Sequence, residues 1–162
     1  MDFQPHSGRI LLVGAGPGAA DLLTLRAVKA LAAADVVVHD GLVGDEVMAL
    51  IPAHARRISV AKRRARHTLP QEDIGDLLVA EARAGHTVVR LKGGDPFIFG
   101  RGGEEVDAAI AAGVPVHVVP GISAANGAAA STLMPLTHRD HASMVSFVAG
   151  ECRGLAEQNW AG

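Results

Sequence analysis

Short apolar segments alternate with helix-like segments along most of the 162 residues, and this alternation restricts the fold more than any other feature. Strands are predicted at 10–13, 36–39, 57–60, 87–91, 116–119 and 144–149. Helices are predicted at 25–34, 43–51, 70–84, 104–112 and 123–131. Strands separated by helices of about ten residues indicate an α/β fold, with a mostly parallel sheet and helices on both faces.

Composition excludes several classes of protein. Hydrophobic residues make up 49% of the chain and charged residues 20%, which favours a packed core over a disordered chain. A formal net charge of −2 argues against binding nucleic acid through bulk charge. Cys152 is the single cysteine, so neither a disulfide framework nor a cysteine-based zinc site is expected. The chain has no signal pattern and no apolar run of roughly 20 residues, so we expect a cytoplasmic protein without a membrane span.

A domain boundary is expected near residues 134–141, which contain a proline, two histidines and little periodicity. We therefore expect a first domain at 1–137, followed by a linker and the first strand of a truncated second domain at 138–162. His138 and His141 lie in this boundary segment without a third ligand nearby, so no metal site is predicted.

Glycine-rich loops follow three of the predicted strands, at 14–18, 93–96 and 120–123. In an open parallel sheet, ligands bind beyond the carboxyl ends of the strands. Glycine lets the backbone approach a ligand closely or adopt positive φ. These loops predict a ligand site at one edge of the sheet, with ordinary tight turns as the alternative.

The first glycine loop also allows a reading as a nicotinamide-dependent oxidoreductase. Gly14, Gly16 and Ala19 match the spacing of the dinucleotide fingerprint, and Asp40 ends the next strand. Two features weaken this reading: Pro17 lies inside the loop, and the helix signal begins only at Thr24.

Basic residues are concentrated around the third predicted strand, at Arg56, Arg57, Lys62, Arg63, Arg64 and Arg66. Arginine side chains bind carboxylates in a bidentate manner, so this cluster favours a small-molecule substrate with several carboxylates. The alternative is a solvated basic face. Nucleic acid is a poorer fit because no aromatic residues are interspersed.

Distinctive motifs lie at 13–18, 23–25, 35–40, 61–63, 90–105, 119–122 and 135–139. In these motifs the chain resembles the uroporphyrinogen-III C-methyltransferase family of the tetrapyrrole methylase superfamily. The similarity runs from about residue 9 to 160, and the loop 91–105 is its most specific part.

The resemblance implies two α/β domains with S-adenosylmethionine held between them, of which this chain would supply the first domain and the first strand of the second. It implies methylation of uroporphyrinogen III at carbons 2 and 7 to give precorrin-2, a precursor of sirohaem, cobalamin or haem d1. A homodimer is the usual form of the family. Further cofactor contacts are expected beyond Gly162, so we expect these 162 residues alone to be inactive. A superfamily methylase that acts on a later precorrin is the alternative.

The resemblance also implies roles for individual residues. Asp40 would accept a proton and Lys62 would donate one. The eight carboxylates of the implied substrate suit the basic cluster, in which Arg63, Arg64 and Arg66 are the candidate substrate-binding residues. The cofactor-binding positions would be Pro17, Gly93, Gly94, Asp95, Ile98, Ser123 and Ala124. Taken without the resemblance, Asp40 and Asp95 are equally consistent with turn formation, and Lys62 with a surface lysine.

Overall fold

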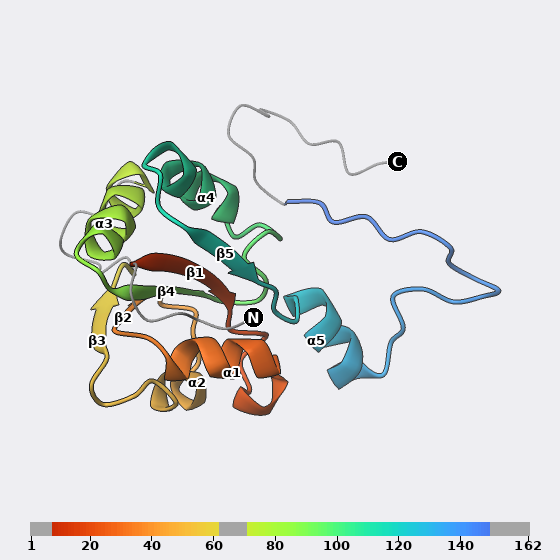
Figure 1. Ribbon diagram of the computed structural model, residues 1–162. Helices are drawn as coiled ribbons and strands as arrows, with labels where there is room; N and C mark the ends of the chain where they lie inside the picture. Colours follow the sequence, from red (N-terminus) through yellow and green to blue (C-terminus); the bar gives the residue numbers. More distant parts are fainter. Residues whose placement is uncertain (1–7, 62–70, 150–162) are drawn as a thin grey trace.

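The computed structural model describes residues 8–61 and 71–149 and contains a single parallel sheet. Its strands are β1 (Arg9–Gly14), β2 (Val36–His39), β3 (Arg56–Ser59), β4 (Thr87–Lys92) and β5 (Val116–Val119). They lie in the order β3-β2-β4-β1-β5, and every neighbouring pair is parallel (Figure 1). The predicted α/β fold is confirmed, and all the carboxyl ends of the strands meet at one edge.

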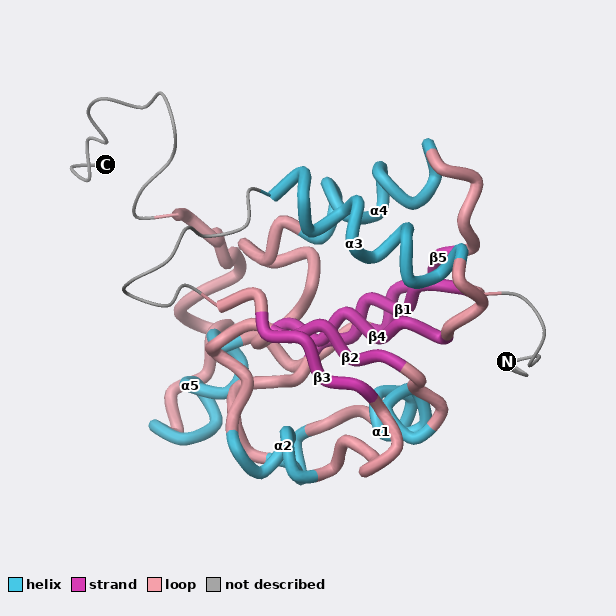
Figure 2. Tube along the Cα trace, turned by 90° about the vertical axis from the view of Figure 1, so that its left-hand side faces the viewer, coloured by secondary structure: helices cyan, strands magenta, loops and turns pink. Residues whose placement is uncertain are grey.

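Helices cover both faces of the sheet, as the alternation predicts. Figures 1 and 2 show α1 (Leu25–Ala32) and α2 (Asp45–Ala49) on one face, and α3 (Gln71–Arg83) and α4 (Gly102–Ala111) on the other. The last helix, α5 (Ala124–Thr132), lies beyond the carboxyl ends of β1 and β5. Both ends of each of the five helices lie within two residues of the predicted ends.

Side chains of successive residues on each strand point to opposite faces, so the sheet divides the core into two layers. On β1, Leu11 and Val13 pack in the layer with α1 and α2, whereas Ile10 and Leu12 pack in the layer with α3 and α4. All four side chains have no solvent exposure. Burial on both faces explains why the strands are continuous apolar runs in the sequence.

The helix ends follow the local chemistry of the sequence. The Thr24 hydroxyl oxygen accepts a hydrogen bond from the Ala27 backbone N–H at 3.1 Å and caps α1, as predicted. Gly85 and Gly113 follow α3 and α4 with φ of 95° and 67°, a conformation that glycine adopts without strain and that ends a helix. A 3₁₀ turn at Ala20–Leu22 was not predicted.

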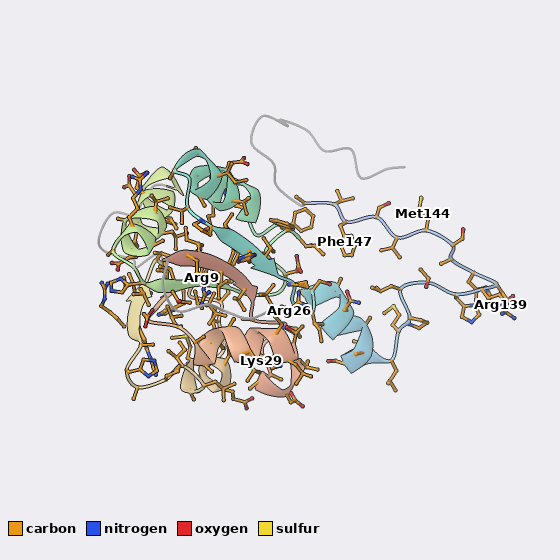
Figure 3. The ribbon with its side chains drawn as sticks, in the orientation of Figure 1. Arg9, Arg26, Lys29, Arg139, Met144 and Phe147 are labelled. Carbon is orange, nitrogen blue, oxygen red and sulfur yellow. The ribbon has the colours of Figure 1, made fainter. Side chains whose placement is uncertain are left out.

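The predicted strand at 144–149 is wrong. The segment forms no ladder with any described strand, and Met144 is 79% exposed. Figure 3 shows Arg139 and Met144 on an extended excursion far from the sheet. A strand is stable only when a neighbour pairs with its backbone groups, and no described strand lies beside this segment.

In the described residues 8–61 and 71–149, no helix is long and apolar enough to cross a membrane.

Candidate active site

A pocket of about 1020 Å³ opens at the carboxyl edge of the sheet, at the upper end of the range of about 300–1,000 Å³ for small-molecule sites. Residues that follow each of the five strands line it. The structure brings together in this pocket every predicted site residue that it describes, namely Pro17, Asp40, Gly93, Gly94, Asp95, Ile98, Ser123 and Ala124.

Three glycines, of which Gly94 lines the pocket, touch backbone to backbone where β1, β4 and β5 end. A Cβ on Gly14 would lie 2.6 Å from the Gly121 Cα and 2.6 Å from the Gly94 carbonyl oxygen, which is too close for any side chain. Gly16 and Gly94 exchange backbone hydrogen bonds of 3.2 and 2.8 Å and have φ of 72° and 64°. Glycine is thus required here by contact and by conformation, and the loops present backbone groups to a ligand.

Asp95 connects two of these loops through its carboxylate. Its Oδ1 accepts a hydrogen bond from the Phe97 backbone N–H at 2.8 Å, and its Oδ2 accepts one from the Gly121 N–H at 3.0 Å. The turn-forming role considered from the sequence is therefore present. Because Asp95 also lines the pocket, the same carboxylate shapes the ligand site.

Ser123 is buried at the start of α5 and caps it. Its Oγ accepts a hydrogen bond from the Asn126 N–H at 3.2 Å and donates one to the Asn126 Oδ1 at 2.5 Å. Gly127, on the next turn, lets the helix pack on the first glycine loop, since a Cβ there would lie 2.6 Å from the Pro17 Cβ. The first turn of α5 consequently lies against the pocket.

Asp40 is held by a buried arginine. Its Oδ1 accepts a hydrogen bond from Arg90 Nη2 at 2.6 Å, and the Asp40 side chain retains 29% exposure where it faces the pocket. The Arg90 side chain is 2% exposed. Its Nη1 also donates to the backbone oxygens of Val38 and Leu91. This geometry fixes the position of a carboxylate that can accept a proton from a bound molecule.

Glu105 of α4 completes the buried cluster. Its Oε1 accepts a hydrogen bond from Arg90 Nε at 2.8 Å, and both of its oxygens lie 3.0 Å from Lys92 Nζ. Burial lowers the pKa of the Lys92 ammonium, and the neighbouring Arg90 cation lowers it further, while Glu105 opposes both effects. Two carboxylates and two cations thus balance one another at the base of the pocket.

Sequence reasoning missed Arg90, Lys92 and Glu105 as members of the site. The available signal was the pair of cations at alternate positions of an otherwise apolar strand, since residues two apart on a strand share a face. A buried cation needs a partner of opposite charge, and Glu105 follows on the next helix.

The loop after β4 forms an apolar lip at the pocket. Phe97 and Phe99 are 59% and 62% exposed, and Ile98 is 38% exposed. Phe99 and Arg101 have φ of 53° and 55°, unusual values for residues other than glycine. Such backbone strain is concentrated at functional sites, and Ile98, Phe99 and Arg101 all line the pocket.

Of the basic cluster around the third predicted strand, the structure describes Arg56 and Arg57. Arg56 and Arg57 begin β3 at the opposite edge of the sheet from the pocket. Arg56 forms an ion pair with Glu81, and Arg57 donates to the Ile51 carbonyl oxygen. The interpretation of Arg56 and Arg57 as part of a substrate-binding cluster is therefore wrong, because both residues stand at the amino end of β3 and neither lines the pocket. Lys62, Arg63, Arg64 and Arg66 lie outside the described residues.

The described part of the chain contains no group of three or more metal-ligating side chains. His138 and His141 stack with their ring centroids 4.5 Å apart, on the excursion that Figure 3 shows far from the sheet.

The nicotinamide reading fits this geometry poorly. A dinucleotide fingerprint requires the helix N-terminus directly after the glycine loop, where it binds the pyrophosphate. Here a 3₁₀ turn at Ala20–Leu22 intervenes and α1 begins only at Leu25.

Comparisons with known proteins agree on one family. The family model of tetrapyrrole (corrin/porphyrin) methylases matches residues 9–162. Siroheme synthase 3 of Aeromonas hydrophila is 55% identical over 156 residues, which are 96% of this chain and 33% of that protein. A crystal structure of uroporphyrin-III C-methyltransferase from Thermus thermophilus is 48% identical with a TM-score of 0.73, over 82% of this chain and 55% of that one.

A further structure of the Thermus thermophilus methyltransferase, complexed with S-adenosylhomocysteine, is 51% identical with a TM-score of 0.68 and covers 82% of this chain and 54% of that one. The chain therefore spans about a third of the curated relative and about half of the solved enzymes.

Proposed function

The chain belongs to the tetrapyrrole methylase family, and we propose that it serves the S-adenosylmethionine-dependent C-methylation of uroporphyrinogen III at carbons 2 and 7, which gives precorrin-2. The observation that carries this proposal is the convergence of the described site residues on one pocket, with Asp40 clamped beside glycine backbone loops. Solved relatives with 48% and 51% identity are uroporphyrin-III C-methyltransferases.

The glycine loops suit the cofactor. The junction of Gly14, Gly94 and Gly121 leaves no room for side chains, so a ligand above it would meet backbone N–H and carbonyl groups. These groups can hold the adenosine and amino-acid parts of S-adenosylmethionine without a bound metal. The Thermus thermophilus structure complexed with S-adenosylhomocysteine supports this choice of cofactor, and Pro17, Ile98 and Ala124 line the pocket that would hold it.

In the proposed reaction the protein has to align the cofactor with the substrate and to transfer protons. S-adenosylmethionine supplies a sulfonium methyl group, which an electron-rich pyrrole carbon can take by in-line displacement. Holding the two reactants in line contributes more than covalent assistance in such a step. A proton must then leave the tetrapyrrole, and Asp40 faces the pocket with an oxygen available to accept it.

Lys62, Arg63, Arg64 and Arg66 complete the proposal, although they lie outside the described residues. Each methyl transfer releases one proton net, so a proton that Lys62 donates while the ring system tautomerises would be matched by a second proton taken from the ring. Uroporphyrinogen III carries eight carboxylates, and arginines at 63, 64 and 66 would bind some of them. Neutralising Arg63 and Arg64 together is then expected to raise the KM for the tetrapyrrole and to leave the cofactor Kd unchanged.

The direct test measures transfer of labelled methyl groups from S-adenosylmethionine to uroporphyrinogen III by the full-length protein, with the Asp40→Asn variant beside it. The amide oxygen that this substitution introduces can still accept from Arg90, so folding and S-adenosylhomocysteine binding are expected to persist. Turnover should fall by about 10²–10⁴-fold because the proton acceptor is lost.

The matched control for this test is Asp107→Asn, an exposed acid on α4 outside the pocket, which should keep wild-type turnover. Full activity of Asp40→Asn would reduce Asp40 to a turn residue. Homodimer formation and a cytoplasmic location belong to the same proposal, and light scattering and cell fractionation test them.

A further inference from the structure

We propose that Glu105 is a positioning residue: through Arg90 it holds the Asp40 carboxylate in place for the reaction, without itself touching the substrate. This inference rests on the proposed methyl transfer and deepens it. Glu105 is fully buried, and neither the proposed cofactor binding by the glycine loops nor the proposed proton transfer uses it directly.

The contacts form one continuous chain from the helix to the pocket. Glu105 Oε1 binds Arg90 Nε at 2.8 Å, and Arg90 Nη2 binds Asp40 Oδ1 at 2.6 Å. The guanidinium is planar and rigid, so fixing its Nε also fixes the direction in which Nη2 points. The Glu105 side chain has no exposure and that of Arg90 has 2%, whereas that of Asp40 has 29%. Arg90 also lines the pocket, whereas Glu105 does not, and Asp40 is the most exposed of the three side chains.

Charge explains why an acid is needed at position 105. Without Glu105, the cations of Arg90 and Lys92 would lie side by side on β4, both buried, with Asp40 as the one carboxylate in the cluster. Like charges in a buried site repel strongly because little water screens them. Lys92 would then compete with Arg90 for Asp40, or displace it. Glu105 places both of its oxygens at 3.0 Å from Lys92 Nζ and so leaves Arg90 Nη2 for Asp40.

The sequence spacing supports this arrangement. Arg90 and Lys92 are two residues apart and share the face of the sheet that α3 and α4 cover. Gly102 begins α4 with no space for a side chain, since a Cβ there would lie 2.5 Å from the Pro96 carbonyl oxygen. That close contact sets where α4 starts and thus brings Glu105 over the two cations.

The first experiment measures the contact itself in the 162-residue chain and needs no activity. In ¹⁵N-arginine spectra, the Nη2 protons of Arg90 report the bond to Asp40, whereas the Nε proton reports the bond to Glu105. Glu105→Gln should speed their exchange with water by about tenfold or more. Asp107→Asn, on the same helix but exposed, should leave the exchange unchanged. Nη2 protons that stay protected in Glu105→Gln would overturn the proposal.

The second experiment measures catalysis in the full-length protein. Glu105→Gln should lower kcat by about 100-fold, the cost of a small misplacement of a reacting group, with little change in KM. Glu105→Asp, which keeps the charge, should recover part of the loss. In an Asp40→Asn background, Glu105→Gln should cost almost nothing more, because both changes disable one device. Additive losses would show that Glu105 acts elsewhere.

The proposal can still be tested if Glu105→Gln does not fold or if the wild-type protein proves inactive. If Glu105→Gln does not fold, the double variant Glu105→Gln/Lys92→Met removes one buried charge of each sign and carries the same exchange measurement. If the wild-type protein transfers no methyl group to uroporphyrinogen III, the proposed function fails, while the Nη2 exchange still decides whether Glu105 positions Arg90 on Asp40.

Discussion

Gly14 and Gly121 pack backbone against backbone where the adjacent strands β1 and β5 end, so that a Cβ on Gly121 would lie 2.8 Å from the Gly14 Cα. The same Cβ would lie 2.2 Å from the Gly94 carbonyl oxygen. Three loops from three neighbouring strands thus converge without side chains between them. The junction of the three loops, which reaches the candidate site at Gly94, is built from main chain, and any side chain added there would push the loops apart.

Gly121→Ala is expected to destabilise the protein by about 1–3 kcal/mol, the usual cost of overpacking, and to weaken S-adenosylhomocysteine binding. The matched control is Gly103→Ala on α4, where an added Cβ meets nothing within 4 Å. That change should be neutral or stabilising by up to about 1 kcal/mol. Urea unfolding and calorimetric titration of both variants make the comparison. Equal stability of the two variants would contradict the tight junction.

Asp95→Ala should weaken S-adenosylhomocysteine binding by at least about tenfold, since it releases the Phe97 and Gly121 N–H groups that the carboxylate holds and each lost hydrogen bond costs about 1 kcal/mol or more. Asp95→Asn keeps one acceptor oxygen and should lose less. Titration of the ligand into both variants, with circular dichroism to verify the fold, tests this. An unchanged Kd in a folded Asp95→Ala protein would remove Asp95 from the site.

Lys92 should make the stability of the protein depend on pH. Its pKa is lowered in the fold from 10.5 by burial and by Arg90. Between the lowered pKa and 10.5 the unfolded chain binds more protons than the folded one, so the free energy of unfolding rises with pH across that interval. Below the lowered pKa this contribution is constant.

The measurement is urea unfolding of the wild type and of Lys92→Met at increasing pH above neutrality. The rise should be smaller in Lys92→Met. It should persist in Lys29→Met, which removes an exposed lysine on α1. A difference between wild type and Lys92→Met that does not vary with pH would show that Lys92 is not perturbed by its burial.

Local pattern sufficed to predict most of the fold. The strands at 36–39 and 116–119 are found with the predicted bounds, since apolar runs bounded by turn residues are a local signal. The segment 144–149 has the same apolar character but no neighbour among the described strands. Whether such a run becomes a strand depends on an available partner edge, which no local pattern encodes.

The buried cluster around Arg90 could not be predicted from the local sequence pattern for a related reason. Arg90 belongs to a predicted strand, yet its partners are Asp40, which is 50 positions earlier, and Glu105, which is 15 positions later. The order β2-β4 in the sheet brings the first close, and the face chosen by α4 brings the second. Both contacts depend on the order of the strands in the sheet and on the face that each helix covers. The resemblance supplied Asp40, but not the pair of residues that hold it.

A polypeptide of these 162 residues is expected to bind S-adenosylhomocysteine far more weakly than the Thermus thermophilus methyltransferase. The chain spans 54% of that enzyme in its S-adenosylhomocysteine complex, so contacts made by the remainder of the enzyme have no counterpart in such a polypeptide. Every 1.4 kcal/mol of lost contact is about a tenfold loss in affinity. The exposed side chains of Leu133, Met134 and Phe147 also favour self-association of the polypeptide. Isothermal titration of a monodisperse sample measures the affinity. A low-micromolar Kd for S-adenosylhomocysteine would contradict this expectation, because it would show that the pocket residues of these 162 residues suffice to bind the ligand.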